Sequence, residues 1–197
     1  MAALLAPLLM WVEFFVMGSL RPGYNLVTGA ASELAARATT NAAVYSAGFF
    51  FLPGILTLFV AAGLWRTGRG SALWRIGAVL VAVAGALLVL TGVFPLDRDS
   101  ALSTELHNIV SQSCFVVATV AMLLLAAGAS RIPWEGVPRK LWLAVGLALA
   151  AVEVFNVTVR QAMGLPNGLF QRPFMILLTV WFVVTGIWLL RTDAQRE

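Results

Sequence analysis

Several polar and ionisable side chains of this sequence stand inside long apolar stretches, where their presence needs a reason. Glu153, Asn156 and Arg160 are spaced by three and four residues, so on a helix they occupy one narrow face. His107 and Ser111 are four residues apart and form a second stripe of the same kind. Burying an ionisable group in an apolar layer is costly, so each of these residues needs a partner or a function.

The positions of two carboxylates along their stretches indicate a common depth. Glu13 precedes Arg21 by eight residues, which is about 12 Å along a helix. Glu153 precedes Arg160 by seven residues, which is about 10 Å. Half of the hydrocarbon layer of a membrane is about 15 Å thick. Both carboxylates are therefore expected in the half of the membrane that lies next to these arginines.

Polar residues on other apolar stretches fall at the same level and predict a shared cavity. Tyr45 belongs to the second stretch, and Arg172 stands at the start of the last one. The residues expected at the cavity are Glu13, Tyr45, His107, Ser111, Glu153, Asn156, Arg160 and Arg172, with Glu33 and Asp97 from two loops at its rim. Such a cavity would open toward the outer leaflet, beneath the loops that follow the first and third stretches.

Six mostly apolar stretches are long enough to carry these side chains across a membrane, since a spanning helix needs about 20 such residues. None of them alternates apolar and polar residues as a barrel strand does. The first carries Glu13 and has no basic residue before Arg21, so it is expected to be a helix and not a cleaved signal peptide. The spans are expected at about 3–20, 42–64, 73–94, 107–128, 141–160 and 173–190. These stretches predict an all-α, six-helix transmembrane bundle, one integral membrane domain over residues 1–197.

The distribution of basic residues predicts how this bundle is oriented. The second and fourth connections and the C-terminal tail hold most of the Lys and Arg residues. Because basic loops stay on the cytoplasmic side, both termini are expected in the cytoplasm, with the protein crossing the cell membrane several times. The cavity then belongs to the outer half of the membrane, where residues 28–37 could form a short surface helix.

Composition excludes several other classes of protein. Apolar residues make up 60% of the chain and charged residues 11%, whereas soluble domains have about 45–50% and about 25%. The net charge of +4 is spread along the chain, so no nucleic-acid partner is expected. A single Cys and a single His predict no internal disulfide, no metal site and no cofactor.

Four short segments resemble a known family. Residues 21–25 (RPGYN) and 31–34 (ASEL) resemble its first outer loop, residues 92–97 (GVFPLD) with His107 ten residues on resemble its third, and residues 168–172 (GLFQR) precede a last helix that contains Trp. The family is the prokaryotic, polytopic domain of unknown function 998, and the resemblance covers about residues 5–190. This chain departs from the family pattern in having Ala30-Ala31 before Ser-Glu in place of Ile, Ala35 in place of Gly, and Gln171 in place of an acidic residue.

The resemblance implies no established activity, but it directs attention to the outer side of the bundle. The matching motif positions are Tyr24, Ser32, Glu33, Phe94, Pro95, Asp97, His107 and Arg172. Tyr24 thereby joins the candidate binding residues. The favoured hypothesis is the binding or handling of a membrane lipid or small amphiphile. Arg160 and Arg172 would meet an anionic head group, with Glu33, Asp97 and His107 at the rim.

Three other functions remain open. An intramembrane hydrolase would use His107 as base, Ser32 or Ser111 as nucleophile, and Asp97 or Glu33 to orient the imidazole, although no G-x-S-x-G turn is present. A proton-coupled carrier would use Glu13 and Glu153. In a purely structural protein, the buried charges would pair to hold the bundle or to assemble it with a protein partner.

Overall fold

The computed structural model describes residues 1–68, 70–97, 99–131 and 136–194, which form helices joined by loops, with no strand among them. The helices are α1 (Ala2–Leu20), η1 (Ala31–Ala35), α2 (Ala42–Ser46), η2 (Ala47–Phe51), α3 (Leu52–Thr67), α4 (Ala72–Val93), α5 (Ala101–Gly128), η3 (Ala129–Arg131), α6 (Arg139–Phe155), η4 (Asn156–Arg160) and α7 (Asn167–Ala194). The short helix η1 is a 3-10 helix, and η2 and η4 are π-helical turns that continue into or out of longer helices.

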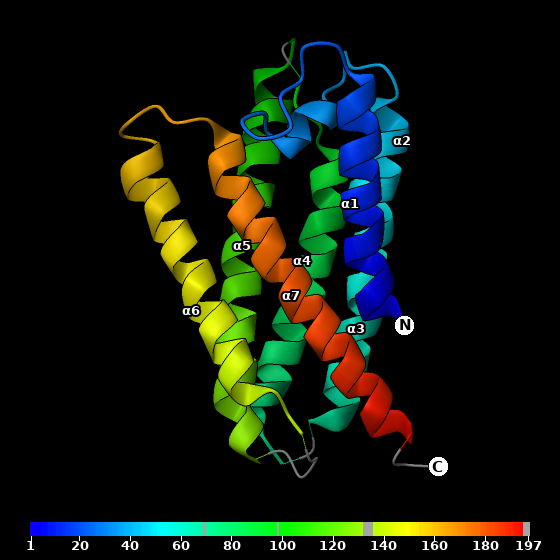
Figure 1. The fold of residues 1–197 in the computed structure, drawn as a ribbon, viewed down its shortest axis with the longest axis vertical. Helices are drawn as coiled ribbons and strands as arrows, with labels where there is room; N and C mark the ends of the chain where they lie inside the picture. Colours follow the sequence, from blue (N-terminus) through cyan, green and yellow to red (C-terminus); the bar gives the residue numbers. More distant parts are fainter. Residues whose placement is uncertain (69, 98, 132–135, 195–197) are drawn as a thin grey trace.

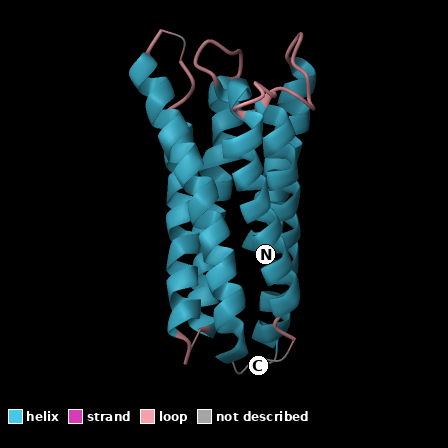
Figure 2. Cartoon of the chain, turned by 90° about the vertical axis from the view of Figure 1, so that its left-hand side faces the viewer, coloured by secondary structure: helices cyan, strands magenta, loops and turns pink. Residues whose placement is uncertain are grey.

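Six of the resulting rods are long and apolar enough to cross a membrane. They are Ala2–Leu20, Ala42–Thr67, Ala72–Val93, Ala101–Arg131, Arg139–Arg160 and Asn167–Thr192. The predicted all-α bundle with six spans is therefore confirmed for the described residues. Figure 2 shows the rods running the length of the molecule, with the loops gathered at its two ends.

Two spans begin about one and a half turns earlier than predicted, because their first residues are polar and escape a search for apolar runs. The fourth span begins at Ala101, where the Ser100 hydroxyl accepts a hydrogen bond from the Ser103 amide. The last span begins at Asn167, and Pro173 lies inside it. These added turns stand at the end of the bundle that carries the first and third loops, and they bring polar side chains to that end.

The spans pack in a closed ring. Each rod contacts the next one along the chain, and α7 returns to contact α1. Figure 1 shows α7 crossing the front of the bundle obliquely, while the upper end of α6 diverges from it. The helix axes therefore spread at the upper end, which also holds η1 and the first loop.

Four indole rings fill the opposite, lower half of the ring. Trp142 lies 5.4 Å from Trp74 and 5.6 Å from Trp188, measured between ring centroids, and 6.2 Å from Trp181. All four side chains are at most 4% exposed. We call these four residues the tryptophan cluster. They join α4, α6 and α7 into one apolar core at the end opposite the first loop.

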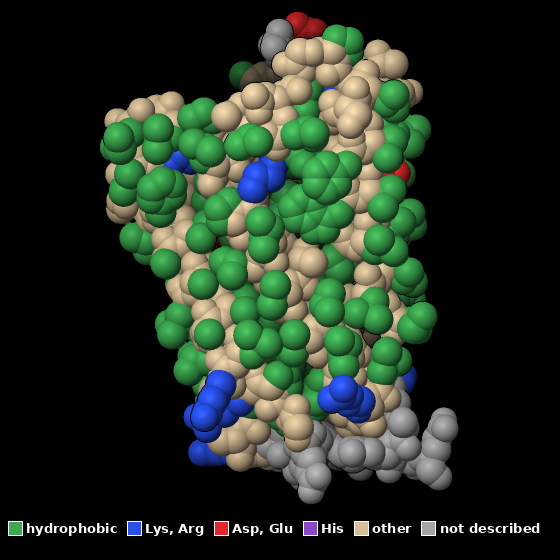
Figure 3. All heavy atoms as spheres, in the orientation of Figure 1, with side chains coloured by type: hydrophobic (Ala, Val, Ile, Leu, Met, Phe, Trp, Pro, Cys, Tyr) green, Lys and Arg blue, Asp and Glu red, His purple; other side chains and the backbone are tan. Residues whose placement is uncertain are grey.

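The outer surface suits contact with lipid. Large apolar side chains such as Phe59, Leu147 and Ile176 are more than half exposed. The face in Figure 3 is covered by hydrophobic side chains over its middle, with Lys and Arg at its lower end and also in its upper part. The described cations near the lower ends of the helices include Arg66, Arg75, Arg139, Lys140 and Arg191.

Replacing Trp142 by Ala should lower the free energy of unfolding by about 3–5 kcal/mol, because a fully buried ring is removed from among three other indoles. The control is Phe59→Ala, since Phe59 is 64% exposed on the outer surface; this change should cost about 0.5 kcal/mol or less. Denaturant unfolding in detergent micelles, followed by circular dichroism, measures both. Equal losses for the two variants would show that the tryptophan cluster is not the packing centre of the lower half.

Candidate functional site

A polar cavity of about 670 Å³ opens at the upper end of the bundle, between α5, the end of α6 and α7. The short helix η1 contributes Ser32 and Glu33 to its wall, and Ala30, which directly precedes η1, lines it as well. Its further lining residues are Leu96, His107, Asn108, Ile109, Ser111, Gln112, Ser113, Phe115, Asn156, Arg160, Gln161, Asn167, Phe170 and Gln171. Most of these are polar, and we call this space the polar cavity.

A chain of hydrogen bonds connects the charges beside the polar cavity. The Arg160 Nε donates to Asn156 Oδ1, Asn156 Nδ2 donates to Gln112 Oε1 at 3.4 Å, and Gln112 Nε2 donates to Glu153 Oε2 at 2.7 Å. The two amides thus lie between a guanidinium and a carboxylate, each with its oxygen toward the cation and its nitrogen toward the anion. The predicted stripe on the fifth span is real, and Gln112 on α5 completes it.

The π-helical turn η4 supplies the upper part of this stripe. It spans Asn156 to Arg160, and the Gln161 amide bonds to the Asn156 carbonyl. Asn156 is 3% exposed, so both of its amide hydrogen bonds are made away from bulk water. Isolated π-helical turns are rare and occur frequently at functional sites, which makes η4 a feature of the site as well as of the helix.

Arg160 brings a positive charge to the polar cavity, which the acidic Glu33 also lines. Beyond its bond to Asn156, its Nη1 donates to the Leu165 carbonyl at 3.2 Å. Among the described residues, no carboxylate lies within salt-bridge distance of Arg160. Glu153 is outside the cavity lining and is reached only through the two amides, so a negatively charged group in the cavity would find a cation already oriented.

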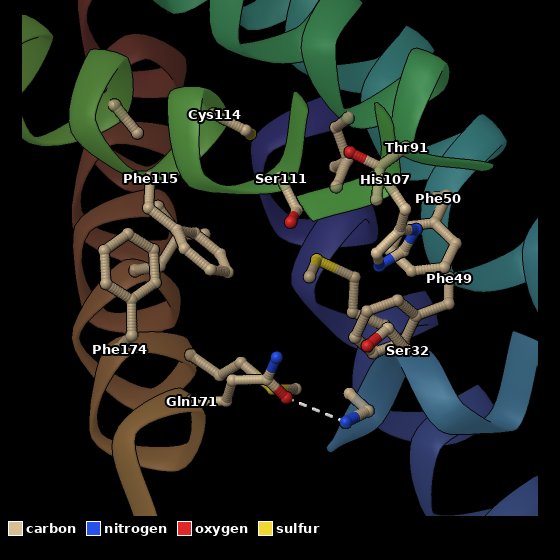
Figure 4. A pocket seen from close by; sticks show the side chains of 16 residues that line it. Ser32, Phe49, Phe50, Thr91, His107, Ser111, Cys114, Phe115, Gln171 and Phe174 are labelled. Atoms are coloured by element: carbon tan, nitrogen blue, oxygen red, sulfur yellow. Dashed lines mark hydrogen bonds between the residues drawn. The ribbon is translucent and has the colours of Figure 1, made fainter. Parts of the chain in front are cut away.

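A smaller, mostly apolar space adjoins the polar cavity. This apolar chamber has a volume of about 80 Å³ and shares Ser32, His107, Ser111, Phe115 and Gln171 with the polar cavity. The side chains that surround it are Met10, Ala31, Phe49, Phe50, Leu88, Thr91, Cys114, Ala118, Phe174, Met175 and Leu178. Figure 4 shows these side chains arranged around the chamber, with the shared polar residues Ser32, His107, Ser111 and Gln171 distributed among them.

His107 and Gln171 each use one polar atom in a hydrogen bond with the backbone and direct the other polar atom toward the chamber. The His107 Nδ1 lies 2.7 Å from the Phe94 carbonyl, which can only accept, so this nitrogen carries the proton. The Gln171 Oε1 accepts from the Ala31 amide at 2.8 Å. Figure 4 shows the second ring nitrogen of His107 and the amide nitrogen of Gln171 facing the chamber.

Arg172, a predicted cavity residue, makes its hydrogen bonds with the first loop. Its Nε donates to the Leu26 carbonyl at 3.0 Å, its Nη2 donates to the Gly29 carbonyl and to the Tyr24 hydroxyl, and its Cζ lies 4.1 Å from the centroid of the Phe14 ring. It is not among the residues that line the polar cavity. We assign Arg172 to fixing the first loop over the bundle, which leaves Arg160 as the cation of the cavity.

Tyr24 belongs to the same anchor. Its hydroxyl donates to the Ala30 carbonyl at 2.9 Å. Burial raises the pKa of this phenol above its ordinary value, although the neighbouring Arg172 opposes that effect. The hydroxyl therefore stays protonated at neutral pH and remains a donor to the loop.

Asp97 connects two outer loops, and Glu33 holds the first loop together. Asp97 forms a 3.1 Å ion pair with Arg37, and the Arg37 amide donates to the Leu96 carbonyl. Glu33 Oε1 accepts from the Ala30 amide, while its carbonyl accepts from Arg21. Both acids line an outer basin that adjoins the polar cavity, and Glu33 lines the polar cavity as well.

Glu13 and Tyr45 lie away from both spaces. Glu13 packs against Gly48 in the π-helical turn η2, between the first and second spans. Tyr45 is completely buried and stacks on Phe49 at 4.8 Å between ring centroids. Neither residue lines the polar cavity or the apolar chamber.

The geometry does not assemble the hydrolase that the sequence allowed. Among the described residues, no hydrogen bond connects His107 with Ser32, Ser111, Asp97 or Glu33. The imidazole is oriented by a backbone carbonyl, and the Asp97 carboxylate is held by Arg37. The described residues also contain no group of three His, Cys, Asp or Glu side chains that could hold a metal ion.

The carrier hypothesis meets a different obstacle. A carrier needs a route from Glu13 or Glu153 to both faces of the membrane. The tryptophan cluster fills the lower half of the ring with side chains at most 4% exposed. In this conformation these buried rings stand between the polar cavity and the lower end of the bundle.

Two functional side chains were not among the candidate residues. Gln112 connects the fourth and fifth spans, and its position one turn beyond Asn108 on a polar part of α5 was the available signal. Gln171 aims its amide into the chamber, and the signal was its departure from the family pattern at that position. An uncharged amide can be buried at a lower cost than an ionised group, so its position in an apolar stretch is a weaker sign of function than that of an arginine.

Comparison with known proteins identifies the family. The family model described as protein of unknown function (DUF998) matches residues 4–188. Since this match covers nearly the whole chain, the protein belongs to that family. No curated protein and no solved structure matches the chain.

Replacing Arg172 by Gln should speed amide hydrogen exchange in residues 24–35 by about tenfold or more, because the lost charged hydrogen bonds contribute about 1.5–3 kcal/mol. Exchange followed by mass spectrometry measures this in detergent micelles. The matched variant Arg160→Gln removes the same charge but no bond to the first loop, so exchange there should stay unchanged. A similar increase in both variants would contradict the division of roles between the two arginines.

Proposed function

We propose that this member of the DUF998 family binds a lipid or small amphiphile with an anionic head group in the polar cavity, in the outer half of the membrane. The observation that carries the proposal is Arg160, a partly buried cation that is oriented by Asn156 and the Leu165 carbonyl. No carboxylate among the described residues pairs with it directly.

Electrostatics favour an anionic ligand at this position. A guanidinium beside the apolar layer is costly unless its charge is compensated. Phosphate and carboxylate groups fit the planar fork of an arginine and form charge-assisted hydrogen bonds that are stronger than neutral ones. The only carboxylate connected to Arg160 in the described network is two amides away, so an anion in the cavity would provide the closer partner.

The dimensions and surroundings of the cavity support the same function. Its volume of about 670 Å³ falls among those of small-molecule sites, which are about 300–1,000 Å³. The apolar chamber continues from it and suits the hydrocarbon part of an amphiphile. The cavity and the chamber together offer the polar and apolar surroundings that the two parts of such a molecule require.

The proposed orientation places the site on the outer side of the cell membrane. The described cations Arg66, Arg75, Arg139, Lys140 and Arg191 lie at the end of the bundle opposite the cavity. By the positive-inside rule this end faces the cytoplasm, and the termini with it. The ligand would then enter from the outer leaflet or from the space beyond it.

The test is lipid retention after purification, with the Arg160→Gln variant compared with the wild type by native mass spectrometry and lipid identification. Wild-type protein should carry a bound anionic lipid or amphiphile. The variant should retain about tenfold less, since hydrogen bonds to a charged group contribute about 1.5–3 kcal/mol.

Arg139→Gln is the matched control, because it removes one exposed cation from the opposite end of the bundle. It should retain the ligand as the wild type does. Equal retention by all three proteins, or a wild type with no bound anionic molecule, would refute the proposed function.

A further inference from the structure

The residues shared by the polar cavity and the apolar chamber form a neck with its own hydrogen-bonding character. His107 is 2% exposed, and its Nδ1 is already bonded to the Phe94 carbonyl. Its second ring nitrogen faces the chamber. A buried nitrogen of this kind is an acceptor that awaits a donor.

Gln171 adds a hydrogen-bond donor to the neck, and Ser111 adds a second acceptor. The Gln171 oxygen is occupied by the Ala31 amide, so its two amide protons remain free to donate. The Ser111 hydroxyl donates to the Asn108 carbonyl at 3.2 Å, so its oxygen can still accept. The neck therefore offers donors and acceptors side by side, which a plain hydrocarbon would leave unsatisfied at a cost.

The chamber beyond the neck limits the number of hydrocarbon chains. One buried water needs about 10–15 Å³ of this kind of volume, so the chamber of about 80 Å³ holds roughly five to eight groups of that size. A methylene group is similar in size to a water molecule. The chamber thus accepts the first part of one chain and has no room for a second chain beside it.

We propose that the site selects a single-chain amphiphile that carries an ester carbonyl and a free hydroxyl between its anionic head and its chain. This inference rests on the proposed function, because it requires the head group at Arg160. The ester carbonyl accepts from Gln171, the hydroxyl donates to His107 or Ser111, and the chain enters the apolar chamber. A diacyl lipid lacks the hydroxyl and carries a chain that the chamber excludes.

Three probes of matched chain length separate these features: 1-octanoylglycerol-3-phosphate, 1,2-dioctanoylglycerol-3-phosphate and octyl phosphate. Their affinities are measured by titration with native mass spectrometry on the full chain. The monoacyl probe should bind about three- to tenfold more tightly than octyl phosphate, because each added hydrogen bond contributes about 0.5–1.5 kcal/mol. The diacyl probe should bind at least about threefold more weakly than the monoacyl probe, since it has lost the hydroxyl.

Two variants test the neck directly. Gln171→Leu and Ser111→Ala should each reduce the preference for the monoacyl probe over octyl phosphate, while binding of octyl phosphate itself stays nearly constant. Ser111 bonds only within its own helix, so its variant is expected to fold even if Gln171→Leu disturbs η1. Arg160→Gln should weaken both probes alike.

The outcomes distinguish this inference from the function on which it rests. If the diacyl probe binds as tightly as the monoacyl probe, or if the neck variants leave the preference unchanged, the inference is overturned while Arg160-dependent binding still supports the proposed function. If no probe binds in a manner that depends on Arg160, both are overturned.

Discussion

A cation that stands inside the apolar part of a helical bundle must be supplied with acceptors, and the upper half of this protein is organised by that requirement. Hydrogen bonds through Asn156 and Gln112 connect the Arg160 guanidinium to the Glu153 carboxylate, although the two charged groups do not touch. These hydrogen bonds fix the rotation of α6 against α5. They also leave the guanidinium at the wall of the polar cavity, where direct pairing with Glu153 would have neutralised it.

Two arginines at the same end of the bundle show how surroundings decide the role of a residue type. Arg172 is surrounded by loop carbonyls and by the face of Phe14, and it thereby fixes the first loop as a roof. Arg160 has fewer protein acceptors and lines an open space. Arg172 thus holds the first loop in place over the cavity, and Arg160 lines that cavity, where a ligand can reach it.

The six spans could be predicted because the thickness of the membrane dictates the length of each apolar run. The stripe of Glu153, Asn156 and Arg160 could be predicted from helical periodicity. The role of Arg172 could not, because its partners are backbone carbonyls, which every residue carries. Periodicity also orders side chains only on their own helix. It could not show that Glu13 and Tyr45 turn toward the contact between the first and second spans, away from the cavity.

The central claim is that an anionic group occupies the polar cavity beside Arg160. The most direct measurement is a cryo-electron microscopy map of the protein in nanodiscs formed from its native membrane. The account predicts density within hydrogen-bonding distance of the Arg160 guanidinium that continues past His107 and Gln171 into the apolar chamber. A cavity that contains only water, with Arg160 turned to pair directly with Glu153, would contradict it.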